Sequence, residues 1–257
     1  MNLEFDGLKS FLSCPLKSGD GIFDRFAGLE GAVLRGRRPQ RFLYLPGSRP
    51  DRVLLAAHSD TWWDDPESAG GPNRFSEEDG VIRAAKGAPG LGADDRAGCA
   101  MLWALMDLGH SLLINDGEER GRMGSRFLME DPSNRDIAEE INEGHGFAVQ
   151  FDRRNARDFK CYDVGTDEFR SYVAKMTGYA EPDRSSFTDI VSICRRMPGV
   201  NLSVGYYDEH GPDERLVLDE WRNTLEMARE WLSKPLSRFL LTEPAMNESK
   251  ALHQRGR

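Results

Sequence analysis

Residues 52–60 read Arg-Val-Leu-Leu-Ala-Ala-His-Ser-Asp, an apolar run that ends directly in a histidine and an aspartate. An uninterrupted apolar run of this length is typical of a buried β-strand. A second apolar run, Arg41–Leu45, precedes it, and Pro46-Gly47-Ser48-Arg49-Pro50 between the two has the composition of a turn. The sequence therefore predicts two strands with a turn between them, and His58 at the carboxyl end of the second.

Two further apolar runs end in acidic residues. Ser111–Asn115 runs directly into Asp116-Gly117-Glu118-Glu119, and Gly146–Phe151 is followed at once by Asp152. Both runs have the length and composition of strands. If their carboxyl ends lie together, the acidic residues lie together as well.

Segments with helical periodicity alternate with these strands. Asp94–Leu108 carries apolar residues at helical spacing, and either Asp94 or Asp95 suits its N-cap. Thr166–Met176 and Leu218–Leu232 are also predicted to be helices, the second of them long and amphipathic. Helices of this kind pack their apolar face on a sheet.

Two more strands are expected in less regular surroundings. Val200–Val204 precedes a loop, Gly205–His210, which ends in a histidine. Gly80–Ala85 interrupts the polar, Gly- and Pro-rich stretch Asp64–Pro89. The alternation of strands and helices predicts an α/β fold: a doubly wound, mainly parallel sheet with helices on both faces. In such sheets, sites form beyond the carboxyl ends of the strands.

Length and charge limit the kind of protein. With 257 residues and 39% hydrophobic content, the chain can bury a sizeable core, and we expect one domain over residues 1–243 and a polar, flexible tail over residues 244–257. The net charge of -9 and the pI near 5.2 disfavour nucleic acid or an anionic membrane as partner, because both need clustered cations. No segment has the length and hydropathy of a membrane span or a secretory signal. The four cysteines are scattered without CxxC spacing, which favours the cytoplasm.

The residues at the ends of the predicted strands have the chemistry of a two-metal site. Two divalent ions can be held by nitrogen and carboxylate ligands if one carboxylate bridges them and each ion takes one histidine and one further carboxylate. His58 and His210 are then the imidazoles, Asp94 is the bridge, and Glu119 and Asp152 are the outer carboxylates. We expect zinc, and cobalt or manganese also suits these donors.

Two other acidic residues suit roles beside the ions. Asp60 stands two positions beyond His58, on the same side of an extended segment, where it can accept the other imidazole N–H and fix the tautomer. Glu118 can take a proton from the attacking water and pass it to a leaving nitrogen. The sequence therefore predicts a hydrolytic site with Glu118 and Asp60 as its catalytic residues.

Other residues compete for some of these roles. The alternatives to Asp152 are three acidic residues further along the chain, Asp158, Asp163 and Asp189. The alternatives to His210 are His110 and His145, and His145 precedes a strand, which places it at the opposite edge of the sheet. A plain helix N-cap is the simpler interpretation of Asp94.

The motifs, in this order, resemble those of the co-catalytic zinc exopeptidases of the M28 and M20 clan, which include aminopeptidases, carboxypeptidases and N-acyl amino acid deacylases. The matching motifs are His58-Ser59-Asp60-Thr61, Gly92-Ala93-Asp94-Asp95-Arg96-Ala97-Gly98, Gly117-Glu118-Glu119-Arg120-Gly121 with Gly124-Ser125 after it, Phe151-Asp152, and His210 before the terminal helix. They extend over roughly Leu43 to Leu232, most of the chain. The resemblance implies a zinc-exopeptidase-like fold, the roles given above, and a cis peptide bond between Asp94 and Asp95.

The chain also departs from this clan. M20 enzymes usually insert a lid or dimerisation domain between the positions that match Asp152 and His210, and the interval here is too short for one. We therefore expect a bare catalytic domain, as in the M28 aminopeptidases. Trp62-Trp63 and the stretch up to Pro89 lie outside the shared pattern, and the two tryptophans either wall a substrate pocket or serve in packing.

One more segment concerns the substrate. Ser186-Phe187-Thr188-Asp189 resembles the segment that lies near the substrate's end group in this clan, which makes Thr188 and Asp189 candidates for substrate binding. The start of a helix is the alternative interpretation.

The expected function is metal-dependent hydrolysis of a terminal amide bond, and the first candidate is an aminopeptidase that acts on peptides. A deacylase of N-acyl amino acids or another small metabolite uses the same metal centre. A non-catalytic metal-binding domain is the alternative from another class, and Glu118 counts against it because such a domain needs no base.

Overall fold

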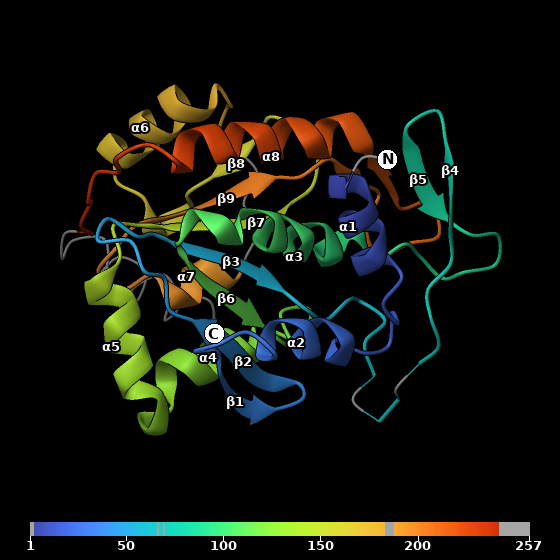
Figure 1. Cartoon of the computed structure of the whole chain (residues 1–257), viewed down its shortest axis with the longest axis horizontal. Coiled ribbons are helices and arrows are strands. Elements are labelled where there is room, and N and C mark those ends of the chain that lie inside the picture. The colour runs from blue at the N-terminus through green and yellow to red at the C-terminus, as the bar shows by residue number, and fades with distance from the viewer. Residues whose placement is uncertain (1–2, 66, 69, 183–187, 242–257) are drawn as a thin grey trace, which may run out of the picture.

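The computed structural model describes residues 3–65, 67–68, 70–182 and 188–241. Its main sheet has seven strands in the order β1-β2-β6-β3-β7-β9-β8 (Figure 1). In that order the strands are β1 (Val33–Arg37), β2 (Gln40–Leu45), β6 (Ser111–Asn115), β3 (Leu54–His58), β7 (Ala148–Arg153), β9 (Gly199–Ser203) and β8 (Phe159–Lys160). The predicted α/β fold with a mixed, doubly wound sheet is confirmed.

The centre of this sheet is parallel and its two sides are antiparallel. β6, β3, β7 and β9 pair in parallel, and β2 and β8 run the other way. β1 pairs antiparallel with β2 and therefore runs in the direction of the central strands. Every residue of β3, β6 and β9 is buried, as expected of central strands that are covered on both faces.

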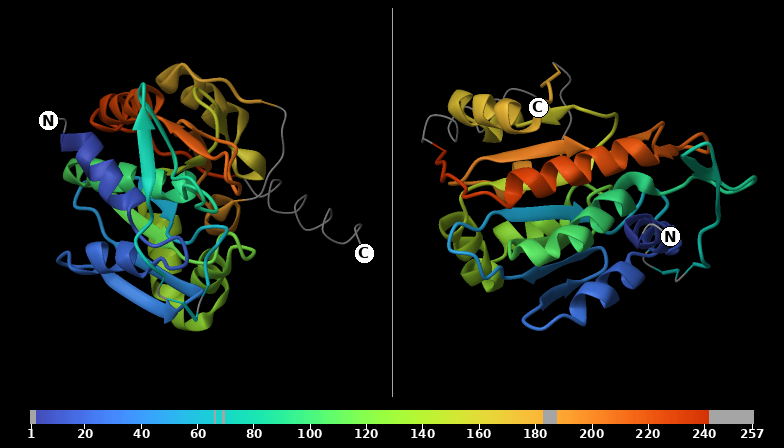
Figure 2. Two further views of the ribbon diagram at one scale, coloured as in Figure 1. Left: turned by 90° about the vertical axis from the view of Figure 1, so that its right-hand side faces the viewer. Right: turned by 45° about the horizontal axis from the view of Figure 1, so that its top comes forward.

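Helices cover both faces of the sheet and enclose two cores (Figure 2). The first core lies under α1 (Leu3–Leu12), α2 (Asp20–Ala27), α3 (Ala93–Leu105), α6 (Asp167–Thr177) and α8 (Leu218–Leu232). The second lies under α4 (Met123–Glu130), α5 (Arg135–Gly144) and α7 (Asp189–Ile193). Because side chains of a strand alternate between its faces, Leu55 and Ala57 of β3 enter the first core and Leu54 and Ala56 enter the second.

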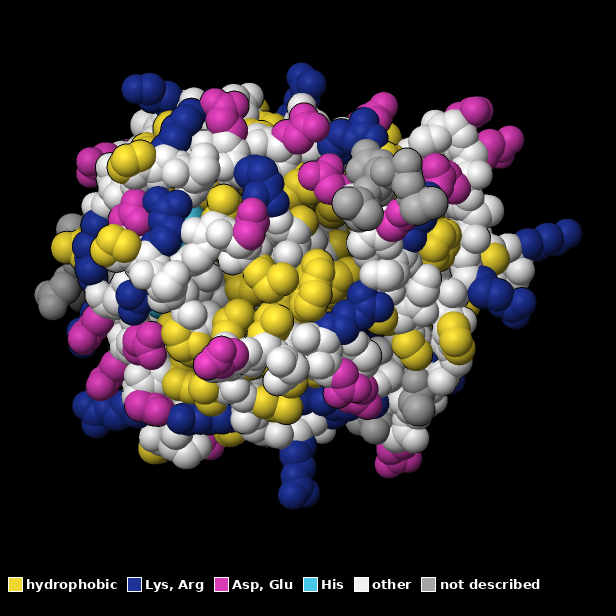
Figure 3. All heavy atoms as spheres, in the orientation of Figure 1, with side chains coloured by type: hydrophobic (Ala, Val, Ile, Leu, Met, Phe, Trp, Pro, Cys, Tyr) yellow, Lys and Arg dark blue, Asp and Glu magenta, His cyan; other side chains and the backbone are white. Residues whose placement is uncertain are grey.

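The outside of the first core is partly apolar. Figure 3 shows apolar side chains gathered at the centre of this face, with charged residues around them. Trp103 and Met106 are among the partly buried residues that pack on this core. This surface lies on a face of the sheet, whereas the acidic motifs lie at the carboxyl edge of its strands.

A second, antiparallel sheet stands beside that edge, on the right of Figure 1. Its order is β10-β11-β5-β4, with β4 (Phe75–Glu78), β5 (Val81–Ala84), β10 (Tyr206–Tyr207) and β11 (Arg215–Val217). It connects the stretch before Pro89 to the hairpin that carries His210. The sequence predicts a plain loop over Gly205–His210, which is wrong for Tyr206 and Tyr207. These two residues form β10 only because they pair with β11, so no local pattern indicates the strand.

The place of Asp152 differs from the sequence prediction, and two further details complete the description of the fold. The strands on either side of Pro46–Pro50 are not neighbours, because β6 lies between them and pairs with both. Asp152 lies inside β7 rather than after it. The short 3-10 helices are Met106–Leu108, Pro132–Asn134 and Tyr162–Val164.

Some predictions fall outside the described residues. These are the tail 244–257 and, from the substrate segment, Ser186 and Phe187. Among the residues that are described, no helix is long and apolar enough to cross a membrane.

Candidate metal centre

The predicted ligands lie at the point where the chain changes the face of the sheet. From β3 the chain returns to β6 through α3 on one face, and from β6 it reaches β7 through α4 and α5 on the other. β6 and β7 flank β3 on its two sides, so the connections diverge at the carboxyl end of β3, the place where sites form in sheets of this kind. His58 is the last residue of β3, and Asp152 comes from β7 beside it.

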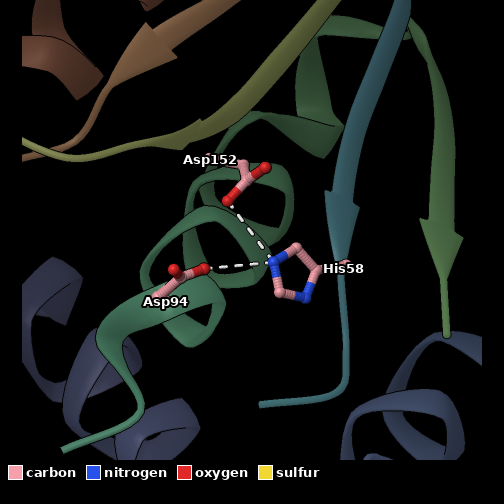
Figure 4. Close-up of side chains that lie close together, drawn as sticks. All are labelled: His58, Asp94 and Asp152. Atoms are coloured by element: carbon pink, nitrogen blue, oxygen red, sulfur yellow. Dashed lines mark hydrogen bonds and ion pairs between the residues drawn. The ribbon is translucent and has the colours of Figure 1, made fainter. Parts of the chain in front are cut away.

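His58, Asp94 and Asp152 form the first group of ligand atoms (Figure 4). Nε2 of His58 lies 3.1 Å from Oδ1 of Asp94 and 3.3 Å from Oδ1 of Asp152. The imidazole is 1% exposed, and both carboxylates point toward its Nε2 from different elements. A cation between these three atoms would have one nitrogen and two oxygen ligands.

Asp94, Glu119 and His210 form the second group. Nε2 of His210 lies 2.7 Å from Oε1 of Glu119 and 3.3 Å from Oδ2 of Asp94. Asp94 therefore gives one oxygen to each group, the geometry expected of a bridging carboxylate. In both groups the three ligand atoms lie within 4.8 Å of one another.

The neighbouring aspartate frees Asp94 for this position. Oδ1 of Asp95 accepts the N–H of Gly98 at 2.9 Å, the bond that an N-cap residue makes, and its Oδ2 accepts the N–H of His58 at 3.1 Å. The backbone of Asp94 and Asp95 is not helical, and the peptide bond between them is cis. Asp95, and not Asp94, is thus the helix cap of the two candidates.

Asp60 contacts both the histidine and the segment of the two glutamates. Its Oδ1 lies 3.3 Å from Nδ1 of His58, and its two oxygens accept the N–H groups of Glu118 and Glu119 at 3.1 Å each. The Nδ1 atom also lies 3.1 Å from the carbonyl oxygen of Asp60. These acceptors favour the tautomer that carries its proton on Nδ1 and leaves Nε2 free as a ligand.

Three side chains orient Asp152. Gln150 and Thr188 donate to its Oδ2 at 2.8 and 2.6 Å, and the hydroxyl of Tyr206 lies 3.4 Å from its Oδ1. Oδ1 is thereby left facing His58. Neither Gln150 nor Tyr206 belongs to a predicted motif, and the one sequence signal for Gln150 is its position two residues before Asp152 on the same strand.

The electrostatics of the two histidines reflects the carboxylates around them. Burial alone lowers the pKa of His58, but Asp152 and the other carboxylates nearby outweigh it and raise the pKa well above its usual value. Burial also lowers the pKa of His210, whereas hydrogen bonds to Asp94 and Glu119 raise it to about 10. Both imidazoles lie where positive charge is favoured.

The carboxylates of the site differ from one another: burial opposes the charge of Asp94, but hydrogen bonds to His210 and His58 outweigh it and lower the pKa of this carboxyl. Burial raises the pKa of Asp152, raises that of Glu118 well above its usual value, and raises that of Glu119 to about 7. Negative charge is concentrated here in a place that water reaches poorly, and divalent cations would compensate it. The donor set, imidazole nitrogens and carboxylate oxygens, is one that zinc accepts.

The remaining site candidates lie at different depths. Trp62 is 56% exposed, and its ring stacks on His210 with centroids 4.7 Å apart and 17° between the planes. Trp63 packs against Gly90, where a Cβ atom would lie 1.9 Å from the indole. The hydroxyl of Thr188 donates a hydrogen bond to Asp152.

Asp189 is fully buried and lies inside a hydrogen-bond network. Its oxygens accept from Ser125 Oγ at 2.6 Å and from Asn115 Nδ2 at 3.0 Å. Both oxygens therefore already have partners within the protein. It is also the first residue of α7, so the helix-start interpretation of this segment describes the structure.

The competing histidines lie elsewhere. His145 contacts Ile141 O and Ser111 Oγ, and Ser111 is the first residue of β6, at the opposite edge of the sheet. His110 contacts the backbone of Val53 and Leu232. Of the competing acids, Asp163 is exposed and Asp158 contacts Asn155 and Ser203.

Two buried charged residues outside the predicted ligand set, Arg96 and Glu214, hold the loops of the site. Arg96 donates to the carbonyl oxygens of Ser59, Pro15 and Ser18, and so fixes the turn after His58. Glu214 accepts three backbone N–H groups of the segment that leads to Asp94. The only sequence signal for Glu214 is its position four residues after His210.

The sequence matches no family model and no curated protein. Among solved structures, the chain is similar to the aminopeptidase PepT from Bacillus cereus, with a TM-score of 0.62 and 14% identity over 90% of this chain and 97% of that one. A tripeptidase from Staphylococcus aureus gives a TM-score of 0.62 and 13% identity over 90% and 98% of the two chains. An aminopeptidase from Desulfurococcus kamchatkensis gives 0.59 and 13% over 91% and 96%. At these identities the similarity shows that the chain has the α/β fold found in these peptidases.

Proposed function

We propose that this protein is a metal-dependent exopeptidase, an aminopeptidase in the first place, that hydrolyses a terminal amide bond at a two-zinc site. The single observation that carries the proposal is the position of Asp94, whose two oxygens face two different histidine and carboxylate pairs. A carboxylate shared by two groups of nitrogen and oxygen ligands is the arrangement that holds two cations side by side. The fold of the solved aminopeptidases and the tripeptidase supports the same function.

Five residues of the chain would hold the ions. His58 and Asp152 would complete the first coordination group, and Glu119 and His210 the second, with Asp94 common to both. Bound zinc ions polarise a scissile carbonyl group and lower the pKa of an attacking water.

Glu118 is the residue best suited to move the proton. It belongs to neither ligand group, yet it adjoins Glu119, and its backbone is held by Asp60. Burial raises its pKa well above the usual value. A carboxylate beside the two ligand groups can accept a proton from the attacking water and give it to the leaving amine. Asp60 acts through His58, whose Nδ1 proton it accepts in a hydrogen bond and whose ring it orients.

Trp62 would contribute to substrate binding. One face of its indole covers His210, and the side chain is more than half exposed. The exposed indole forms an apolar wall beside the second ligand group, where the first side chain of a peptide can pack. Thr188 and Asp189 act within the protein, through Asp152 and through Ser125.

Turnover assays on two kinds of substrate test the proposal. The protein is stripped with a chelator, reloaded with zinc, and assayed with amino-acid anilides and with N-acetyl amino acids, beside Glu118→Gln as a matched inactive control. Zinc-dependent release of the anilide supports the aminopeptidase. Turnover of N-acetyl amino acids alone would identify the deacylase, and metal binding without any turnover would identify the non-catalytic domain.

A further inference from the structure

We propose that Glu214 is a positioning residue that ties the loop of His210 to the segment of Asp94 and thereby sets the second ligand group. The inference rests on the proposed two-metal site and adds to it a residue that binds no ion. Two observations support this role: the contacts of the Glu214 carboxylate, and the position of Glu214 in the loop of His210.

The carboxylate of Glu214 binds the backbone that leads to Asp94. Its Oε2 accepts the N–H of Leu91 at 2.9 Å and that of Gly92 at 2.7 Å, and its Oε1 accepts the N–H of Asp94 itself at 3.2 Å. Glu214 is 1% exposed, so water cannot replace it at these three donors. The partners are more than 100 residues apart, at sequence separations of 120 to 123.

The loop of His210 depends on this anchor. Between Tyr207, the last residue of β10, and Arg215, the first of β11, Glu214 is the one buried residue. The other side-chain contacts of the loop include the contacts of His210 with Glu119 and Asp94, the stacking of Trp62 on His210, and the 2.8 Å ion pair of Glu209 with Arg154. Partly exposed ion pairs such as the last contribute little to stability.

The first ligand group has a connection of its own, because Asp95, next to Asp94, accepts the N–H of His58. His58 and Asp152 lie on adjacent strands, which the sheet holds in register. His210 lies on a loop, with a positive φ of 65°, and must meet Asp94 from another part of the chain. The carboxylate of Glu214 binds the N–H of Asp94, and its own N–H donates to the carbonyl oxygen of Gly211, the residue after His210. Glu214 thereby connects the two backbones and helps to set where Nε2 of His210 lies relative to Oδ2 of Asp94.

A carboxylate is required because all three partners are donors. Glutamine has the same length but only one acceptor oxygen, so its NH₂ group would face a backbone N–H on one side. Glu214→Gln therefore weakens the connection, and Glu214→Ala removes it. Asp213→Asn is the matched control, because Asp213 is the exposed neighbour in the same loop and the substitution removes the same charge.

Zinc titration of the metal-free protein tests the inference, with the two dissociation constants measured by calorimetry in wild type, Glu214→Gln, Glu214→Ala and Asp213→Asn. We expect one of the two constants, that of the second ligand group, to rise by about 10-fold or more in Glu214→Gln and further in Glu214→Ala, as losses of residues that support metal ligands do. The other constant should change by less than about threefold, and Asp213→Asn should match wild type. A purely structural role would lower the melting temperature of the metal-free protein and leave the ratio of the two constants unchanged, which overturns the inference.

The result separates this inference from the proposed function. If wild type binds two ions and Glu214→Gln binds them equally well, only the role of Glu214 is wrong. If wild type binds no ion, the two-metal site fails and the role of Glu214 with it. Should both variants fail to fold, hydrogen exchange of the wild type decides: slow exchange of the Leu91, Gly92 and Asp94 amides supports the anchor, and exchange at the rate of open loops overturns it.

Discussion

The Oδ1 atom of Asp60 lies 3.3 Å from Nδ1 of His58, on the far side of the imidazole ring from Nε2. The same carboxylate accepts the backbone N–H groups of Glu118 and Glu119. One fully buried aspartate thus orients a ligand of the first group and the backbone of a ligand of the second. It also holds the residue that we assign to proton transfer.

Substitution of Asp60 should therefore reduce catalysis more than metal binding. In Asp60→Asn the imidazole keeps its place as a ligand but loses a charged acceptor for its Nδ1 proton, so we expect kcat to fall by about 10-fold to 100-fold. Metal content by elemental analysis should remain close to that of wild type. Unchanged turnover would reduce Asp60 to a structural residue of the loop.

The two adjacent glutamates should separate in their effects. Glu118→Gln keeps size and hydrogen bonding but cannot accept a proton, so kcat should fall by about 10² to 10⁴ with both ions retained. Glu119→Gln should lose affinity for one ion, and excess zinc should restore part of its activity. The two variants serve as controls for each other. If Glu118→Gln lost an ion and Glu119→Gln kept both ions but lost turnover, Glu118 would be the ligand and Glu119 the proton acceptor.

Trp62 should influence substrate preference. In Trp62→Ala the apolar wall beside His210 is lost, and kcat/KM for anilides with a bulky first residue should fall by roughly fivefold to tenfold, or about 1 kcal/mol. The alanyl anilide should be affected less, and Trp62→Phe should keep most of the preference. Equal losses on small and bulky substrates would contradict a contact between Trp62 and the substrate side chain.

His145 should contribute to acid sensitivity independently of the metal centre. It is fully buried, and burial lowers its pKa from 6.5 to about 4. The unfolded chain then binds a proton between pH 6.5 and 4 that the folded protein does not, so the free energy of unfolding falls as the pH decreases through this range. The loss is about 2 kcal/mol at pH 5 and about 3 kcal/mol in full.

Urea unfolding of the metal-free protein at pH 7 and pH 5 checks this effect. His145→Gln removes the titrating ring, so the difference in unfolding free energy between the two pH values should shrink by about 2 kcal/mol. The baseline stability at pH 7 can fall as well, which is why the pH difference is compared. If the difference in unfolding free energy between pH 7 and pH 5 were the same in wild type and His145→Gln, the pKa of His145 would be the same in the folded and unfolded chains.

The main elements of the fold follow from local patterns. The strand that ends in His58 is an uninterrupted apolar run because helices cover both of its faces, and the helix over Leu218–Leu232 shows its buried face as a spacing of three and four. β10 could not be predicted in this way. Its two residues form a strand only because β11 lies beside them.

The same distinction applies to the site. The five ligand candidates could be found because each belongs to a short motif at the end or start of a predicted element, and the structure brings all five together. The sequence left Asp94 and Asp95 equal as helix caps, since only the backbone conformation separates them. Glu214 has no motif of its own, because its role depends on contact with Gly92 at a separation of 122 residues.

The shared carboxylate of Asp94 gives the most direct test of a two-metal centre. Zinc bound to the purified protein is counted by elemental analysis after dialysis, in wild type, Asp94→Ala, Asp152→Ala and His210→Ala. We expect two ions in wild type, none held tightly in Asp94→Ala, and the selective weakening of one ion in each of the other variants, because Asp94 alone belongs to both ligand groups. Two tightly bound ions in Asp94→Ala, or none in wild type, would contradict the shared site.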